Sequence, residues 1–219
     1  MSEIATPAAM FPAPTPSQAL RVLTAALQEL SLAQGILDVQ RVVRTAARQL
    51  TGADGATFVL RDSGSCYYAD EDAIEPLWKG KRFPLQACIS GWAMLNRQPV
   101  VIEDIYSDAR IPHDAYRPTF VKSLVMVPIR TMDPVGAIGI YWAHRHRASE
   151  EQVGLARALA DSTAVALENV RAIEDNARMA RELEEHVVAE AGLRELSETD
   201  ALTELPNRRD WDRRPTTLR

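Results

Sequence analysis

Two runs of apolar residues near the middle of the chain constrain the fold more than any other feature. Residues 123–130 and 135–143 are each nearly continuous in apolar side chains, and four residues separate them. Apolar runs of this length around a short turn are typical of neighbouring antiparallel strands. Because neither run alternates between apolar and polar positions, both faces of these strands must be at least partly covered. The sequence therefore predicts a central strand pair inside a layered fold.

Two helices are predicted before this strand pair. Apolar residues fill one face of residues 39–50, and Asp38 and Gly52 are expected to cap the start and the end of that helix. The helix before it is expected to stop at Gly35. Its leucines recur at a spacing of three or four residues and predict one apolar stripe: Leu20, Leu23, Leu27 and Leu30.

Short apolar runs supply the remaining strands. They lie at residues 56–61, 66–69, 82–85 and 100–102. The acidic residues 70–72 are interpreted as a surface loop, Trp78 as part of an exposed turn or lid, and Trp142 as core. The pattern predicts an α+β fold, with an antiparallel sheet of five to six strands flanked by helices and a long C-terminal amphipathic helix.

The last helix is expected to begin at Ser149, with Gln152 as its capping-box partner. Apolar residues then recur every three or four positions as far as Ala191, among many Glu and Arg residues. An amphipathic helix needs a partner for its apolar stripe, and a second copy of the chain is the simplest one. We therefore expect a homodimer formed through this helix and the helices of the preceding domain.

The composition disfavours several classes of protein. With 25 basic and 30 acidic side chains the net charge is −5, which argues against a nucleic-acid partner. No apolar run approaches the ~20 residues of a membrane-spanning helix, and the N-terminus does not resemble a secretory signal. Two cysteines are too few for a disulfide framework. These features predict a cytoplasmic protein with no membrane partner.

Motifs for common chemistries are missing from the sequence. It contains no Gly-rich phosphate loop, no Ser/His/Asp arrangement and no cysteine pairs at zinc-binding spacing. His144 and His146 lack further ligands nearby and are interpreted as a solvated strand end. We therefore predict no catalytic residue and no metal site, and the cofactor, if any, stays unknown.

Six short motifs in a fixed order resemble the GAF domain, the small-molecule and light-sensing module of bacterial signalling proteins. They occupy residues 89–93, 99–105, 107–110, 123–129, 135–140 and 155–161. The resemblance covers residues 17–172. It implies a sensory domain that holds a small effector between its sheet and a covering loop.

A second resemblance is shorter. Residues 199–209 (TDALTELPNRR) resemble the opening motif of the GGDEF domain, the diguanylate cyclase module, with Glu204 where the family usually has Gly. Only 20 residues follow Thr199, so the family's catalytic signature and its metal-binding carboxylates do not occur in this sequence. The resemblance implies an output in cyclic di-GMP signalling, while this chain as it stands is not expected to be a cyclase.

Together these features predict four regions. Residues 1–16 are Pro-rich and are expected to form a disordered leader. The GAF-like sensory domain follows at 17–172, a signalling or coiled-coil helix at 173–198, and the truncated start of a GGDEF domain at 199–219.

Effector-binding residues are sought in the polar, aromatic segment 104–120, because long loops in compact domains tend to be functional. The candidates are Trp92, Asp104, Tyr106, His113, Tyr116 and Arg117. Mixed aromatic and cationic side chains suit a small anionic effector held by charge-assisted hydrogen bonds. The alternative interpretation is a solvated loop whose aromatic side chains serve as anchors.

Two other functions stay open at this point. Cys88 could serve a GAF-like thiol enzyme of the methionine sulfoxide reductase type, although such relatives carry a different set of cysteines and a buried free cysteine is usually inert. The chain could also be a dimerisation adaptor that binds no ligand.

Overall fold

The computed structural model describes the backbone of residues 14–198 and the side chains of residues 14–190. It divides into two compact units, Met1–Val170 and Arg171–Arg219. One helix, α5 (Glu150–Glu198), is continuous across the boundary between them. The GGDEF-like residues 199–209 and most of the expected leader lie outside the described residues.

A six-stranded antiparallel sheet forms the centre of the first unit. Its strands lie in the order β3-β2-β1-β6-β5-β4. They are β1 (Gly55–Asp62), β2 (Ser65–Ala73), β3 (Arg82–Pro84), β4 (Val100–Ile102), β5 (Ser123–Ile129) and β6 (Gly136–Trp142). Every residue of β5 and β6 is buried, which confirms strands that are covered on both faces. The predicted α+β fold is confirmed.

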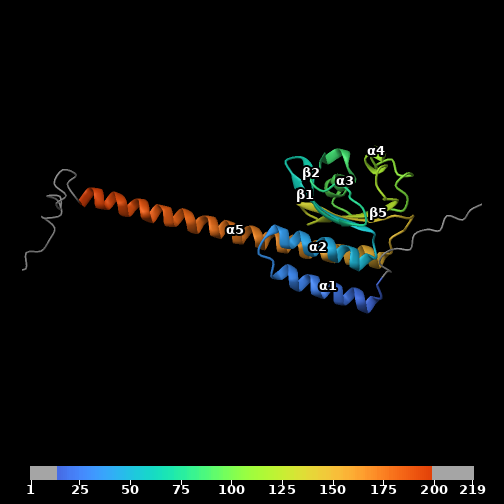
Figure 1. Ribbon diagram of the computed structural model, residues 1–219, viewed down its shortest axis with the longest axis horizontal. Coiled ribbons are helices and arrows are strands. Elements are labelled where there is room, and N and C mark those ends of the chain that lie inside the picture. Colours follow the sequence, from blue (N-terminus) through green and yellow to red (C-terminus); the bar gives the residue numbers. More distant parts are fainter. Residues whose placement is uncertain (1–13, 199–219) are drawn as a thin grey trace, which may run out of the picture. The chain divides into compact units, whose positions relative to one another are not determined.

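Helices cover both faces of this sheet (Figure 1). One face carries α1 (Pro16–Ser31), α2 (Ile36–Thr51) and the first part of α5, and the other carries α3 (Ile89–Asn96) and the short α4 (His113–Tyr116). A 3-10 turn, η1 (Leu85–Ala87), leads from β3 into α3.

The alternation of side chains along β5 separates two hydrophobic cores. Val125 and Val127 pack in the core formed with α1, α2 and α5, whereas Leu124 and Met126 pack in the core formed with α3 and α4. The buried face of α2 is the predicted one, with Val39, Val42, Val43, Ala46, Ala47 and Leu50 all buried. Trp142 is buried in the first of these cores, as expected.

Helix α1 buries only part of the predicted leucine stripe. Its buried residues are Ala19, Ala26 and Leu30, while Leu20 is 64% exposed and Leu27 is 38% exposed. The small side chains of Ala19 and Ala26 allow α1 to pack closely against the core. The spacing of the leucines alone could not show that this side of the helix would be buried. The predicted leucine stripe is therefore confirmed in part: Leu30 is buried and Leu23 packs against the core, whereas Leu20 and Leu27 face outward.

The observed ends of α1 and α2 can be compared with the predicted ones at three positions. Thr15 caps α1 and Pro16 is its first residue, so the helix begins within the last two positions assigned to the leader. Gly35, not Asp38, is the N-cap of α2. Gly52 ends α2 at φ 66°, a left-handed conformation that suits glycine.

The start of α5 matches its predicted capping box. The hydroxyl of Ser149 accepts a hydrogen bond from the backbone N–H of Gln152, and the Gln152 side chain accepts one from the Ser149 N–H. Within residues 14–198, no helix combines the length and the apolar character that crossing a membrane requires. Residues 171–190 of α5, in the second unit, are exposed throughout.

The acidic residues 70–72 lie in strand β2, so their interpretation as a surface loop is wrong. Asp70 is 8% exposed and pairs with Arg44 of α2 at 2.6 Å, and Asp72 pairs with Arg48 of the same helix. The cations that make burial of these carboxylates tolerable lie more than 20 residues earlier in the chain, where no local pattern points to them.

Candidate functional site

The segment between β4 and β5, residues 103–122, covers part of the second core and carries most of the predicted effector-binding residues. Hydrogen bonds join the beginning of this segment to its middle and to its end. The N–H of Ile105 donates to the carbonyl of Lys122 at 2.9 Å, and the ring Nε2 of His113 lies 3.0 Å from the carbonyl oxygen of Ile105. These contacts hold residues 103–122 in one compact conformation over the core, and this segment is called the cover below.

Tyr106, His113 and Lys122 form a cluster on the outside of this cover. The rings of Tyr106 and His113 are 5.9 Å apart, and the Lys122 ammonium lies 5.1 Å from the centre of the Tyr106 ring and 3.4 Å from its hydroxyl. Tyr106 is 46% exposed. An aromatic face, an imidazole and an ammonium are thus presented together at a partly solvated surface.

Asp104 holds Tyr106 in place. One oxygen of its carboxylate accepts a hydrogen bond from the Tyr106 N–H at 3.0 Å, and the other lies 2.5 Å from the guanidinium of Arg145. Both oxygens are therefore engaged by the protein. Asp104 acts as a support for Tyr106.

Trp92 belongs to a second, separate contact. The Arg110 guanidinium lies 4.6 Å from the centre of the Trp92 ring system and donates two hydrogen bonds to Asp108, at 2.9 and 2.5 Å. These hydrogen bonds hold the pKa of Asp108 below its usual range and raise that of Arg110. The pair therefore stays charged while it fastens the cover to α3.

Tyr116 lies beneath the cover, in an aromatic cluster that fills the space between the cover and the sheet. The Trp78 ring makes edge contacts with Tyr116 at 4.7 Å, with Tyr68 at 5.5 Å and with Tyr141 at 5.6 Å. Tyr116 is 3% exposed, and burial raises its pKa well above the usual value. Its hydroxyl therefore stays neutral.

Trp78 is 3% exposed, so its interpretation as an exposed turn or lid is wrong. Its buried position depends on Glu71, whose carboxylate accepts hydrogen bonds from three consecutive backbone N–H groups, those of Leu77, Trp78 and Lys79, at 2.8 to 3.0 Å. This carboxylate folds the chain after β2 into a tight loop and turns the indole inward.

An ion-pair network connects this loop to helix α2. The carboxylate of Asp70 contacts the ammonium of Lys79 at 2.6 Å and the guanidinium of Arg44 at 2.6 Å. Lys79 directly follows Trp78, and Arg44 belongs to α2. The loop that carries Trp78 is therefore joined through Lys79, Asp70 and Arg44 to helix α2 on the other face of the sheet.

The structure brings only part of the predicted residue set together. Asp104, Tyr106 and His113 form one group, Trp92 is paired with Arg110, and Tyr116 lies inside the aromatic cluster. Arg117 is exposed, and its side chain pairs with Asp114 at 3.4 Å. Sequence reasoning missed Lys122, Trp78 and Tyr141, because each reaches the site only through sheet pairing or a remote loop.

Residues 33–168 match the GAF domain family, which is more than half of the chain. The chain belongs to the GAF domain family. This assignment agrees with the sheet, its helical layers and the covering segment. The comparison with curated proteins gives no match.

Several solved structures share this GAF fold. The GAF domain of an Acinetobacter phosphoenolpyruvate-protein phosphotransferase is 16% identical over 73% of this chain and 97% of that one, with a TM-score of 0.63. The free methionine-R-sulfoxide reductase of Neisseria meningitidis is 17% identical over 74% and 95%, with a TM-score of 0.63. The chromophore-binding domain of a bacteriophytochrome from R. palustris is 14% identical over 73% and 64%, with a TM-score of 0.61. At these identities the likeness establishes the fold.

Proposed function

We propose that this GAF domain is a sensor that binds a small anionic effector at the outer cluster of Tyr106, His113 and Lys122. The arrangement of these three side chains carries the proposal. The Tyr106 ring offers a stacking surface, the Lys122 ammonium a positive charge and the His113 imidazole a second polar ring beside them. A small ring-bearing anion matches this combination.

Tyr116 and Trp78 supply a route from this cluster to the helices. His113 and Tyr116 are the first and last residues of α4, so an effector that shifts His113 also moves Tyr116 against Trp78. The Trp78 loop is in turn tied to α2 through the Lys79–Asp70–Arg44 ion pairs. Binding would then favour one packing of the helical layer over another, as a population shift.

We further propose that α5 passes this change to an output of the diguanylate-cyclase type. The support is the continuity of α5 from Glu150 to Glu198 and the resemblance of residues 199–209 to the start of a GGDEF domain. The chain itself should not convert GTP into a cyclic dinucleotide, because the catalytic signature is not in its sequence. Such turnover by the purified chain would contradict this part of the proposal.

Exposed apolar side chains support a homodimer as the working form. Leu27 of α1 and Val165 of α5 line a groove of about 230 Å³ between these helices, and Val165 is 58% exposed. In the second unit, Ile173, Leu183 and Val187 are 48%, 66% and 59% exposed at helical spacing. A second copy of the chain would cover both surfaces.

Effector binding can be tested by a thermal-shift screen of the full chain against mononucleotides, cyclic nucleotides and small aromatic carboxylates. A ligand at about 100 times its dissociation constant stabilises the folded state by ~2.7 kcal/mol. The Lys122→Ala and Tyr106→Ala variants should lose the shift. The matched control is Arg82→Ala in the edge strand β3, which removes a similar cation that lies 4.0 Å from the centre of the Tyr67 ring in β2. A shift that survives both cluster variants would place the effector elsewhere.

The homodimer can be tested by sedimentation velocity. Leu183→Glu should convert the dimer to a monomer, because it places a charge in the apolar stripe. Glu182→Lys changes the charge on the other side of the helix and should leave the dimer intact. A monomeric wild-type chain would contradict the proposed homodimer.

The sensor is favoured over a methionine sulfoxide reductase because Cys88 is only 7% exposed. Little of Cys88 is open to a substrate as large as an amino acid. Turnover of free methionine sulfoxide that Cys88→Ser abolishes would reverse this preference. The adaptor alternative would be supported by a screen in which no compound shifts the melting temperature.

A further inference from the structure

Cys66, Cys88 and Ser90 form a polar cluster inside the otherwise apolar core on the α3 side of the sheet. Cys66 lies on the inward face of β2 and is fully buried, and Cys88 directly precedes α3. Both belong to the same buried cluster and each thiol shifts the pKa of the other, so the two side chains lie near each other in this core. The Cys88 sulfur also lies 3.2 Å from the hydroxyl oxygen of Ser90. The hydrophobic core on this side of the sheet therefore contains two neighbouring thiols.

The hydrogen-bond chain continues from Ser90 to Tyr68. Their hydroxyl oxygens are 3.1 Å apart, and both residues are buried. A thiolate at Cys88 can only accept hydrogen bonds, so Ser90 would donate to Cys88 and Tyr68 would donate to Ser90. Every hydroxyl proton of this chain then points toward the sulfur and stabilises its negative charge.

The backbone at the start of α3 acts in the same direction. The backbone N–H groups of Ser90 and Gly91 lower the pKa of Cys88. Gly91 is needed for this geometry, because a Cβ there would lie 1.7 Å from the carbonyl oxygen of Leu85. The neighbouring Cys66 thiol outweighs burial and, with Ser90 and these amides, lowers the pKa of Cys88. The Cys88 thiol and burial raise the pKa of Cys66.

We propose that Cys66 and Cys88 are a peroxide-sensitive pair that closes reversibly into an intramolecular disulfide. The Cys88 thiolate attacks one oxygen of hydrogen peroxide and the O–O bond breaks, leaving a sulfenic acid on Cys88 and a hydroxide that is protonated to water. The Cys66 sulfur then attacks the Cys88 sulfur. Its proton leaves with the displaced hydroxide as a second water. A dithiol reductant returns both cysteines to thiols.

Burial determines which oxidants this pair can meet. Because Cys88 is only 7% exposed, a small oxidant such as hydrogen peroxide, which is close to water in size, should react with it more readily than a bulky one. The disulfide would join β2 to the start of α3 within the core that also holds Tyr68 and Trp78. This redox response needs no effector, so it stands independently of the effector site proposed above.

The proposal can be tested on the reduced full-length chain by exposing it to hydrogen peroxide and then alkylating the remaining thiols. The expected product resists alkylation at both cysteines, is two hydrogen atoms lighter and gives a linked pair of peptides carrying Cys66 and Cys88. Dithiothreitol should restore both alkylation sites. Two alkylated cysteines after peroxide, or a disulfide between chains in place of the internal one, would overturn the proposal.

Variants separate the roles of the two sulfurs. Cys66→Ser should stop the reaction at a Cys88 sulfenic acid that dimedone traps, and Cys88→Ser should leave Cys66 unoxidised. Oxidation of Cys66 at the wild-type rate in the Cys88→Ser variant would contradict these assignments. Circular dichroism and the melting temperature of each variant report whether it is folded.

Removing the supporting hydroxyl provides a second, milder test. Ser90→Ala should slow oxidation at a pH near or below the pKa of Cys88, because losing this hydrogen bond raises that pKa and lowers the fraction of thiolate. The matched control is Ser162→Ala, which removes a hydroxyl bonded to the Ala158 carbonyl in α5. Should Ser90→Ala fail to fold, Tyr68→Phe removes one oxygen from the same chain and should slow oxidation in the same direction. An unchanged rate in the folded variant would count against the proposal.

Discussion

The indole nitrogen of Trp78 donates a hydrogen bond to the backbone carbonyl of Ala115 at 3.2 Å. This bond joins the loop after β2 to the short helix α4, two segments that are 37 positions apart in the chain. The Trp78 ring also packs against Tyr116, the last residue of that helix. The covering segment is therefore fastened to the rest of the core through Trp78.

Trp78→Phe should destabilise the domain and loosen the cover. Phenylalanine keeps an aromatic ring but leaves the Ala115 carbonyl without its donor, which costs about 1–3 kcal/mol when the acceptor stays buried. Urea unfolding measures the loss, and hydrogen exchange should accelerate at residues 113–117. Tyr67→Phe, at a half-buried ring elsewhere on β2, is the control and should leave this exchange unchanged. Unchanged exchange in Trp78→Phe would show that the cover is held by other contacts.

Gly139→Ala should be strongly destabilising. A Cβ at this position of β6 would lie 2.2 Å from the Tyr141 hydroxyl and 2.6 Å from the Thr57 hydroxyl. Those two buried hydroxyls share a hydrogen bond of 2.9 Å, which the added methyl group would push apart. We expect a loss of about 1–3 kcal/mol from overpacking and a further ~1 kcal/mol from the hydrogen bond, measured by thermal and urea unfolding.

Gly154→Ala is the matched substitution with the opposite expected sign. Gly154 lies in α5, and a Cβ there meets nothing within 4 Å. Alanine is a better helix former than glycine by about 0.5–1 kcal/mol, so this variant should be more stable than the wild type. A Gly139→Ala variant that is as stable as the wild type would show that the space around Gly139 does not limit substitution there.

Asp70 makes the stability of the domain depend on pH. Burial alone would raise its pKa, but the hydrogen bond from Lys79 and the charge of Arg44 outweigh burial and lower it. A carboxylate whose pKa is lowered on folding stabilises the folded state above the unfolded pKa of about 3.9, and loses this effect as the pH falls through the folded value.

Asp70→Asn should therefore be less stable than the wild type at pH 7, with the difference shrinking as the pH falls below about 4. Urea unfolding at several pH values measures this difference. Asp38→Asn, in the first turn of α2, controls for the removal of a carboxylate elsewhere. A difference between Asp70→Asn and the wild type that stays constant down to the lowest pH would mean that Asp70 contributes by packing and not by charge.

The parts of the fold that sequence reasoning predicted are those whose signal is local. The continuous apolar runs predict β5 and β6, the apolar face predicts α2, and Ser149 and Gln152 predict the start of α5. In each case the residues that decide the structure are neighbours in the chain. Helix α1 is a partial exception, because Ala19 and Ala26 are buried with Leu30 while Leu20 and Leu27 of the predicted stripe are exposed.

The candidate site was harder to predict because its residues meet across the sheet. Trp78 is turned inward by Glu71, and Asp70 is neutralised by Arg44, a cation 26 positions earlier. Neither relationship follows a helical or strand period. Lys122 reaches Tyr106 only because the covering segment folds back on its own beginning. Such contacts become visible only when the fold is known.

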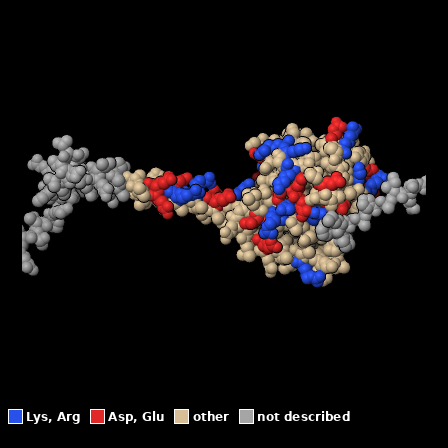
Figure 2. Space-filling view, in the orientation of Figure 1, with Lys and Arg blue, Asp and Glu red and all other residues tan. Residues whose placement is uncertain are grey.

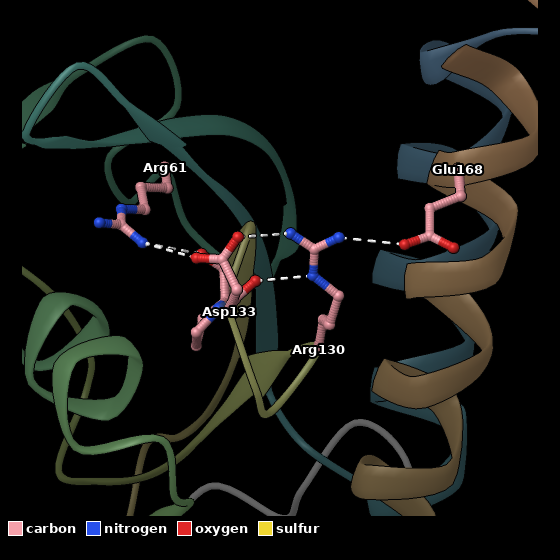
Figure 3. A network of polar contacts seen from close by, with 5 residues as sticks. Arg61, Arg130, Asp133 and Glu168 are labelled. Atoms are coloured by element: carbon pink, nitrogen blue, oxygen red, sulfur yellow. Dashed lines mark hydrogen bonds and ion pairs between the residues drawn. The ribbon is translucent and has the colours of Figure 1, made fainter. Parts of the chain in front are cut away.

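Arg130 ties the turn between β5 and β6 to α5 (Figure 3). Its guanidinium lies 2.9 Å from the carboxylate of Asp133 and 3.0 Å from that of Glu168, and Arg61 approaches Asp133 from β1 at 3.4 Å. Glu168 lies two residues before the end of the first unit. On the face drawn in Figure 2, Lys and Arg side chains alternate with Asp and Glu, so such exposed pairs are numerous and each should be weak.

A double-mutant cycle with Arg130→Ala and Glu168→Ala should give a coupling of about 0.2–1 kcal/mol that decreases with added salt, because both side chains are partly exposed. The matching cycle with Arg61→Ala and Glu168→Ala should be additive, since Asp133 and Arg130 separate these two residues (Figure 3). Coupling of equal size in both cycles would mean that the whole network acts as a unit.

Arg130→Gly separates the charge of Arg130 from its backbone conformation. Arg130 has φ 65°, a left-handed conformation that costs a residue with a Cβ about 1 kcal/mol. Arg130→Gly and Arg130→Ala both lose the ion pairs, but only glycine removes this backbone cost. We therefore expect Arg130→Gly to be the more stable of the two by about 1 kcal/mol in urea unfolding. If alanine were as stable as glycine, the turn would have to relax to a negative φ, and the position of Glu168 relative to the turn would no longer depend on residue 130.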